Sequence, residues 1–196
     1  MPEPQGKVLS RRQETPHVPG FKIRTATAND LDLLVRHRRR MFEEMASPTE
    51  EELRVHDASY RVWAGEMMKR RLLRVYIVET RGGKPAASGG VWLREMQPSP
   101  GHPQGMVPYV LSVYTRPEFR RKGLASMIVE EAMGWAKRHG HYKIVLHASK
   151  TGRKVYSQLG WKRTWEMEFR FDVPAKPRRL TAGKPRRTSR PSRASS

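Results

Sequence analysis

The stretch "RRKGLASMIVEEA", which begins at Arg120, places three cations and a glycine directly before a helical pattern. The segment before it, 106–115, is rich in β-branched and aromatic residues, which is typical of a strand. The apolar residues after the glycine recur at the spacing of one helix face. They are Leu124, Ala125, Ile128, Ala132, Trp135 and Ala136. A strand that passes through a basic glycine turn into an amphipathic helix favours folds in which helices cover a sheet.

The turn itself predicts an anion site. The first turn of a helix leaves about four backbone N–H groups without partners, and the helix dipole adds about half a positive charge there. Gly123 permits close approach because it has no Cβ atom. Arg120, Arg121 and Lys122 add charge, so we expect a phosphate group here. The turn is neither a Walker loop, since no Gly-Lys-Ser/Thr ends it, nor a dinucleotide fingerprint, since it has one glycine.

Hydrophobic periodicity and turn residues predict the other elements. Thr27 and Ser47 are the expected N-caps of the first two helices, with Asp30 and Glu50 three residues later. Gly140 is the expected C′ residue of the third helix. Strands are expected at 21–27, 73–80, 86–96, 106–115, 142–148 and 161–171, and helices at 27–45, 47–71, 124–139 and 151–160. This alternation indicates the α/β class.

Charge and composition limit the function classes. The net charge is +20, of which residues 174–196 hold +8 and residues 21–173 hold +11. A basic folded part favours an anionic ligand or partner. The absence of cysteine excludes disulfides, thiolate metal sites and a cysteine nucleophile. No apolar run approaches the roughly 18 residues of a membrane span, and none opens the chain, so a soluble cytoplasmic protein without membrane contact is expected.

Composition also predicts three regions. Residues 1–20 contain four prolines and little to bury, which indicates a flexible arm. Residues 174–196 consist mainly of Pro, Arg and Ser, which indicates a disordered basic tail. The folded domain is therefore expected at 21–173.

Two further segments lead to a family resemblance. "RRKGLA" is similar to the R-x-x-G-x-A signature of the GNAT superfamily of N-acetyltransferases. "LHASKTGRKVYSQLGW" resembles that family's strand, short helix and LY-x-x-x-GF ending, with Tyr156 at the tyrosine position. "IRTATANDLDLL" matches its first strand and helix, so the resemblance covers 21–171. It implies the GNAT acyltransferase fold, a mixed central β-sheet flanked by helices.

The resemblance implies acetyl-CoA as co-substrate and no metal. In this family the turn holds the pyrophosphate, and the strand before it pairs with pantetheine through its backbone. The implied acetyl-CoA-binding residues are Val113, Tyr114, Thr115, Arg120, Arg121, Lys122, Gly123, Leu124, Ala125 and Ser126. Ser149 stands near the place where many members have a CoA-contacting asparagine, so that contact is not carried over.

The resemblance also implies direct transfer of the acetyl group to an amine, which agrees with the missing cysteine. Tyr156 is then the expected acid toward the CoA thiolate. For the base three alternatives stay open: Glu95 at the end of a strand, His147 with its suitable ordinary pKa, or a chain of waters.

Arg38 is the one candidate for acceptor binding. It lies on the apolar stripe of the first helix, seven residues after Leu31 and four before Phe42. An arginine in such a place snorkels or pairs with an acid. Because the first two helices of this fold border the acceptor site, our hypothesis is that Arg38 orients a carboxylate or phosphate on the acceptor.

The leading functional prediction is an acetyl-CoA-dependent N-acetyltransferase acting on a primary amine of a small molecule or amino acid. One alternative is acetylation of a protein or peptide amine. Another is a nucleic-acid-associated protein, because "AKPRR" and "GKPRR" in the tail would give salt-sensitive, nonspecific contact. A third is a non-catalytic acetyl-CoA sensor. The sequence leaves open the acceptor and the oligomeric state, a homodimer included.

Overall fold

The computed structural model describes residues 17–100, 103 and 105–169. The chain divides into two units, residues 1–162 and 163–196, and the described helices and strands all lie in the first. The predicted basic tail lies outside the described residues, as does the predicted N-terminal arm except for its last four positions.

A five-stranded sheet forms the centre of the first unit, with the strands in the order β1-β2-β3-β4-β5. Its first four strands run antiparallel to their neighbours, and β5 runs parallel to β4. The strands are β1 (Phe21–Thr25), β2 (Leu73–Thr80), β3 (Pro85–Glu95), β4 (Met106–Thr115) and β5 (Val145–Leu146). The helices are α1 (Leu31–Met45), α2 (Glu50–Lys69), α3 (Leu124–Arg138) and α4 (Arg153–Gln158), with short 3-10 turns η1 (Ala28–Asp30) and η2 (Pro117–Phe119).

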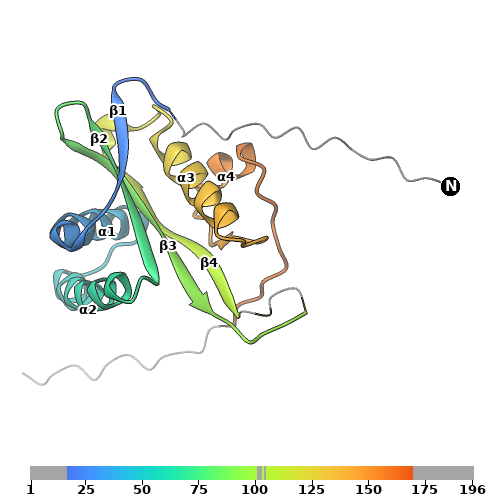
Figure 1. The fold of residues 1–196 in the computed structure, drawn as a ribbon. Helices are drawn as coiled ribbons and strands as arrows, with labels where there is room; N and C mark the ends of the chain where they lie inside the picture. Colours follow the sequence, from blue (N-terminus) through green and yellow to red (C-terminus); the bar gives the residue numbers. More distant parts are fainter. Residues whose placement is uncertain (1–16, 101–102, 104, 170–196) are drawn as a thin grey trace, which may run out of the picture. The chain divides into compact units, whose positions relative to one another are not determined.

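Helices cover both faces of this sheet, with α1 and α2 on one side and α3 and α4 on the other (Figure 1). Strand β2 shows how the sequence produces the two cores, because successive side chains of a strand point to opposite faces. Leu73, Val75 and Ile77 pack in the core under α1 and α2. Tyr76 and Val78 pack in the core under α3. The predicted mixed sheet flanked by helices is confirmed.

The starts of the first two helices test the predicted caps. Thr27 is the N-cap of η1, which leads into α1, and Asp30 Oδ2 accepts a hydrogen bond from the Thr27 amide at 2.8 Å. The prediction of Ser47 for the second helix was wrong, since Thr49 is the N-cap of α2. Thr49 accepts from the Glu52 amide at 3.2 Å, and Glu52 accepts from the Thr49 amide at 2.8 Å. This reciprocal pair satisfies two amides at once, which Ser47 with Glu50 does not.

The C-terminal part is less regular than predicted. Gly140 has φ of 77° just after α3, as expected for its C′ residue. The strand predicted at 142–148 is reduced to Val145–Leu146. The strand predicted at 161–171 was wrong for residues 161–169, which form no strand, and its last two residues lie outside the described part. The alternation of 161–171 suits a strand, but a strand also needs a neighbour, and the two-residue β5 offers a very short one.

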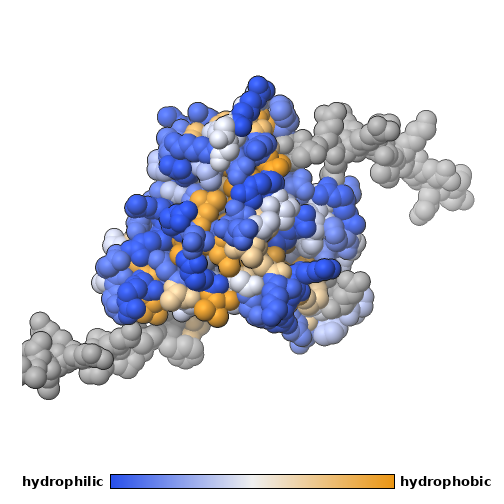
Figure 2. Space-filling model, turned by 60° about the vertical axis from the view of Figure 1, so that its left-hand side comes forward, coloured by the Kyte–Doolittle hydropathy of each residue, from blue (hydrophilic) through white to orange (hydrophobic). Residues whose placement is uncertain are grey.

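Figure 2 shows the side on which α1 and α2 lie. Its surface is mainly hydrophilic, with a band of apolar residues among the polar ones. Large apolar side chains exposed on these two helices are those of Met45, Val55 and Val62. None of the helices in the described ranges is long and apolar enough to cross a membrane.

Candidate active site

The turn between β4 and α3 has an unusual backbone. After η2 the chain passes through Arg121 with φ of 60° and Gly123 with φ of 82°. The left-handed region costs an ordinary residue roughly 1–2 kcal/mol and costs glycine almost nothing. Gly123 is the N-cap of α3 and supplies no side chain to cap it. The turn therefore opens the helix without a side-chain cap at its N-terminus.

Those amides are the donors of the predicted anion site. The amide of Met127 donates to the carbonyl of Gly123 at 3.0 Å. Within the described part of the chain, no acceptor is found for the amides of residues 123–126. Four free N–H groups at a helix start bind a phosphate group well. The residues present therefore fit a pyrophosphate.

The three basic side chains of the turn differ in their contacts. Arg120 donates to both carboxylate oxygens of Glu44 on α1 at 2.6 Å, and its Nε donates to the carbonyl of Thr115 at 2.9 Å. Lys122 lies over the ring of Phe119, 5.7 Å from its centre. No ion pair or ring contact of Arg121 is found with any described residue. Arg120 thus ties the turn to α1, whereas Arg121 is available to a ligand.

Strand β4 carries a bulge just before this turn. Leu111 pairs with Gly90 of β3, and Tyr114 pairs with Ser88, so two residues of β4 stand opposite Gly89 alone. Ser112, the first of them, has φ of 53°. A bulge bends its strand and interrupts the ladder. The bend lies where β4 leaves its other neighbour, β5.

The two strands β4 and β5 pair only at Tyr109 with Val145 and at Val110 with Leu146. Beyond these pairs, no described strand lies on the β5 side of residues 111–115. Their backbone groups can pair with an extended ligand, as in strand addition. This open edge contains the predicted residues Val113, Tyr114 and Thr115 and leads to the amides of 123–126. The hydroxyl oxygen of Thr115 is buried and has no partner among the described residues.

Tyr109 contacts His147 after β5 and acts electrostatically on Tyr156 of α4. The Tyr109 hydroxyl lies 2.5 Å from His147 Nδ1. Tyr156 is half-buried, and burial together with the nearby Tyr109 raises its pKa. Tyr109 thus interacts with two sequence-predicted residues, although the sequence did not single it out because it resembles an ordinary strand aromatic.

Glu95 is not part of this group. It is the last residue of β3 and pairs with Met106, six residues before the bulge at Ser112. At about 3.3 Å per residue the separation along the strand is about 20 Å. Among the described residues, no group of three or more His, Cys, Asp or Glu side chains is arranged to hold a metal ion.

A buried pair under the bulge was missed by sequence reasoning. His37 of α1 is 5% exposed, and its Nδ1 lies 2.9 Å from the hydroxyl of Ser88, the partner of Tyr114. Burial, together with the nearby charges of Arg116 and Arg36, lowers the pKa of His37 to about 4. The ring is therefore neutral at pH 7. His37 stands within "RHRRR", which reads as a solvated face, so its burial had no clear signal in the sequence.

Arg38, the predicted acceptor residue, reaches the same bulge. Its Nη1 donates to the Ser112 hydroxyl at 2.5 Å and its Nε to His56 Nε2 at 3.2 Å. Its guanidinium lies 4.6 Å from the ring centre of Tyr60 and 5.0 Å from that of Phe42. The structure therefore places Arg38 on the α1–α2 side of the sheet, beside the open edge of β4.

The chain is similar to a known protein family and to several solved structures. A model of the acetyltransferase (GNAT) family matches residues 36–161. A GCN5-related N-acetyltransferase from Ralstonia eutropha JMP134 is 29% identical, with a TM-score of 0.70 over 78% of this chain and 99% of its own. An acetyltransferase with acetyl-CoA from Clostridium acetobutylicum is 26% identical, with a TM-score of 0.70 over 76% of this chain and 96% of its own.

More distant structures share the fold alone. The glucosamine-6-phosphate N-acetyltransferase of Arabidopsis thaliana is 23% identical, with a TM-score of 0.54 over 78% of this chain and 99% of its own. No curated protein sequence matches the chain significantly.

Proposed function

Because the chain belongs to the GNAT acetyltransferase family, we propose that it transfers the acetyl group of acetyl-CoA directly to a primary amine of a small molecule or amino acid. The observation that carries this proposal is the open edge of β4, which leads to four free amides at the start of α3. The match over 36–161 contains both, together with Tyr156.

The turn holds the pyrophosphate in this proposal. The amides of 123–126 donate to its oxygens, and Arg121 and Lys122 add positive charge. The backbone of residues 113–115 pairs with the pantetheine arm at the open edge. Acetyl-CoA, when bound, supplies the acetyl group as a thioester. The protein contributes position above all, which is a large part of the rate enhancement in reactions between two bound molecules.

Tyr156 is the proposed acid. Its hydroxyl keeps its proton through neutral pH, because burial and Tyr109 raise its pKa above the ordinary value. A protonated hydroxyl can give that proton to a departing thiolate. Tyr109, hydrogen-bonded to His147, is the proposed route by which a proton returns to Tyr156.

For the base we propose His147 rather than Glu95. His147 contacts the Tyr109 hydroxyl at the inner end of the open β4 edge, whereas Glu95 stands about 20 Å along the strand from the bulge. A water between the acceptor amine and His147 would complete the path. The backbone position of His147 supports this, since it directly follows β5.

Release of free thiol from acetyl-CoA by the full-length protein, measured against a panel of primary amines, tests the proposal. We expect release that requires an amine and disappears in Gly123→Trp, whose side chain would stand over the free amides. A sample that binds acetyl-CoA and releases no thiol with any amine would contradict the transferase and favour a sensor.

A further inference from the structure

Arg38 is a cation held in an apolar setting. Its guanidinium lies between the rings of Phe42 and Tyr60, at 5.0 and 4.6 Å from their centres. Tyr60 is 7% exposed, so little water reaches that side. Burial lowers the pKa of Arg38, but arginine stays charged in proteins because its ordinary pKa is above 12. The result is a charged group with much of its hydration removed.

No acid among the described residues compensates this charge. The two hydrogen bonds of Arg38 go to Ser112 and His56, both of which lack a negative charge. Within the described ranges no carboxylate lies in ion-pair distance of the guanidinium. The nearest acid along α2, Asp57, is already bound by Arg39 at 2.8 Å.

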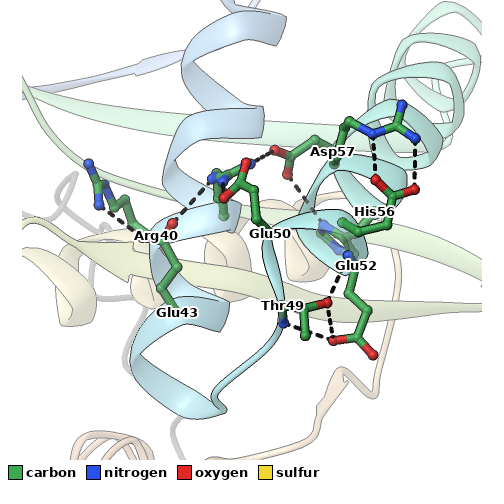
Figure 3. A network of polar contacts seen from close by, with 10 residues as sticks. Arg40, Glu43, Thr49, Glu50, Glu52, His56 and Asp57 are labelled. Atoms are coloured by element: carbon green, nitrogen blue, oxygen red, sulfur yellow. Dashed lines mark hydrogen bonds and ion pairs between the residues drawn. The ribbon is translucent and has the colours of Figure 1, made fainter. Parts of the chain in front are cut away.

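The surrounding network explains why Asp57 stays with Arg39. Arg39 also binds Glu43 at 3.1 Å and Glu50, so three carboxylates of α1 and α2 converge on one arginine (Figure 3). His56 stands between the two arginines, with Nδ1 3.5 Å from Asp57 Oδ1 and Nε2 accepting from Arg38. The acids of this region therefore neutralise Arg39 and leave Arg38 as a half-buried cation without a counter-charge among the described residues.

A small cavity opens at this cation. Its volume is about 10 Å³, room for about one water-sized group. It is lined by side chains of α1 and α2 and by residues of the sheet. The helices contribute Leu34, Arg38 and Tyr60, and the sheet contributes Val75, Ser88, Gly89, Gly90, Leu111 and Ser112. A half-buried cation beside a cavity of this size fits an oxygen of a small anionic group, because a charged hydrogen bond would offset the lost hydration.

The position of the cavity links it to the reaction. Ser112 is followed after about 3.8 Å by Val113, the first backbone position proposed to border the pantetheine arm. An anionic group at Arg38 would therefore lie beside the strand segment proposed to border the pantetheine arm. An acceptor with its anion at Arg38 and its amine at the thioester of that arm is expected to be compact, with its amine and its anion on the same or neighbouring carbon atoms.

We infer that the acceptor is a compact primary amine with an anionic group, a carboxylate or a phosphate, and that Arg38 binds this group at the β4 bulge. The inference rests on the proposed function, because it assigns the acceptor of the same reaction. The shared chemistry is an anionic oxygen that accepts a charged hydrogen bond from the guanidinium fork. The Arg38–Ser112 bond opens or is shared when this oxygen arrives.

The test compares matched amines in the thiol-release assay with the full-length protein. L-Alanine carries a carboxylate, O-phosphoethanolamine a phosphate, and L-alaninamide neither. We expect the wild type to prefer one of the two anionic amines. Arg38→Met should lower kcat/KM for that amine about 10- to 150-fold, mainly through KM, and change the value for L-alaninamide less than about threefold. Arg38→Lys should recover part of the loss, since it restores the charge without the fork.

Arg40→Met is the matched control, because Arg40 lies on the same helix. Its side chain is exposed and pairs with Glu43. It should leave all three amines unaffected. If Arg38→Met instead lowers kcat equally for every amine, Arg38 only positions the bulge and the inference is wrong. A wild type that prefers L-alaninamide overturns it as well.

A binding measurement separates this inference from the proposed function. Thermal unfolding with saturating CoA is followed as each amine is added. A stabilisation by the anionic amines that needs Arg38, without any turnover, would keep the anion site and overturn the transferase. Turnover of L-alaninamide alone would keep the transferase and overturn the anion site. If no amine is turned over and no anionic amine gives an Arg38-dependent stabilisation, the inference is wrong.

Discussion

The hydroxyl of Tyr109 and Nδ1 of His147 lie 2.5 Å apart, across the last paired residues of β4 and β5. The two strands diverge immediately beyond this contact. The pair therefore stands at the inner end of the open β4 edge.

If the pair moves protons as a unit, its two members should not act independently. We expect Tyr109→Phe and His147→Gln each to lower kcat about tenfold with little change in KM for acetyl-CoA, and the double variant to lose no more than either alone. Steady-state kinetics of the four proteins measures this. Losses that multiply in the double variant would mean that the two residues act separately.

Tyr156→Phe removes the proposed acid while keeping the ring. We expect kcat to fall about 100-fold, within the usual range for loss of an acid or base, while acetyl-CoA binding is retained. Because the pKa of Tyr156 is raised, the wild-type rate should lose this acid only above the ordinary tyrosine pKa of about 10. A pH profile of kcat checks it: the alkaline fall should be absent in Tyr156→Phe. An unchanged profile in the variant would assign that fall to another group.

His37 should make the fold sensitive to mild acid. The folded state holds its pKa at about 4, whereas an unfolded chain has about 6.5, so as pH falls below 6.5 the unfolded state takes up a proton that the folded state does not. We expect the free energy of unfolding to drop by up to about 3 kcal/mol between pH 6.5 and 4. The stabilisation from Asp30, whose pKa Arg24 lowers to about 2, is lost only below about pH 4.

Urea unfolding of the wild type and His37→Gln at several pH values measures this dependence. The variant should be less stable at pH 7, because it disturbs the bond to Ser88, but its stability should vary less between pH 6.5 and 4. The same slope in both proteins would show that other groups govern the acid response.

Two glycines of the α3 region should respond to alanine in opposite directions. A Cβ at Gly89 would lie 2.8 Å from Ile128 Cγ2 and 3.0 Å from Val113 Cγ2, so Gly89→Ala should destabilise the fold by about 1–3 kcal/mol. A Cβ at Gly134, inside α3, would meet only the flexible end of Arg138 at 3.0 Å. Gly134→Ala should therefore stabilise by about 0.5–1 kcal/mol through helix propensity. Chemical denaturation gives both values, and equal effects would contradict the packing of α3 on the bulge.

Much of this architecture was predictable because its signals are local. The spacing of Leu124, Ile128 and Ala132 predicts α3, and the glycine turn before it predicts the free amides. Gly140 ends the helix as predicted, because glycine adopts the left-handed conformation that this position needs. The cap of α2 was misplaced because Ser47 with Glu50 and Thr49 with Glu52 carry the same signal, and only the geometry decides between them.

The rest depends on contacts between distant parts of the chain. The bulge at Ser112 arises from the register of two strands, which no local pattern encodes. The Tyr109–His147 contact joins residues 38 positions apart, and the His37–Ser88 contact joins residues 51 apart. Arg38 could be noticed because an arginine on an apolar stripe is unusual, but only the fold shows that none of the described carboxylates pairs with it.

The central claim is that the turn at Gly123 and the open edge of β4 bind acetyl-CoA, and thermal unfolding of the full-length protein with and without acetyl-CoA tests it most directly. At 100 times Kd we expect about 2.7 kcal/mol of stabilisation, a rise in Tm of about 5–10 °C that saturates. Gly83→Trp is the control, since Gly83 has the same backbone strain, φ of 81°, in the turn between β2 and β3. The rise should persist in Gly83→Trp and vanish in Gly123→Trp; no rise in the folded wild type, or an equal rise in both variants, would contradict the account.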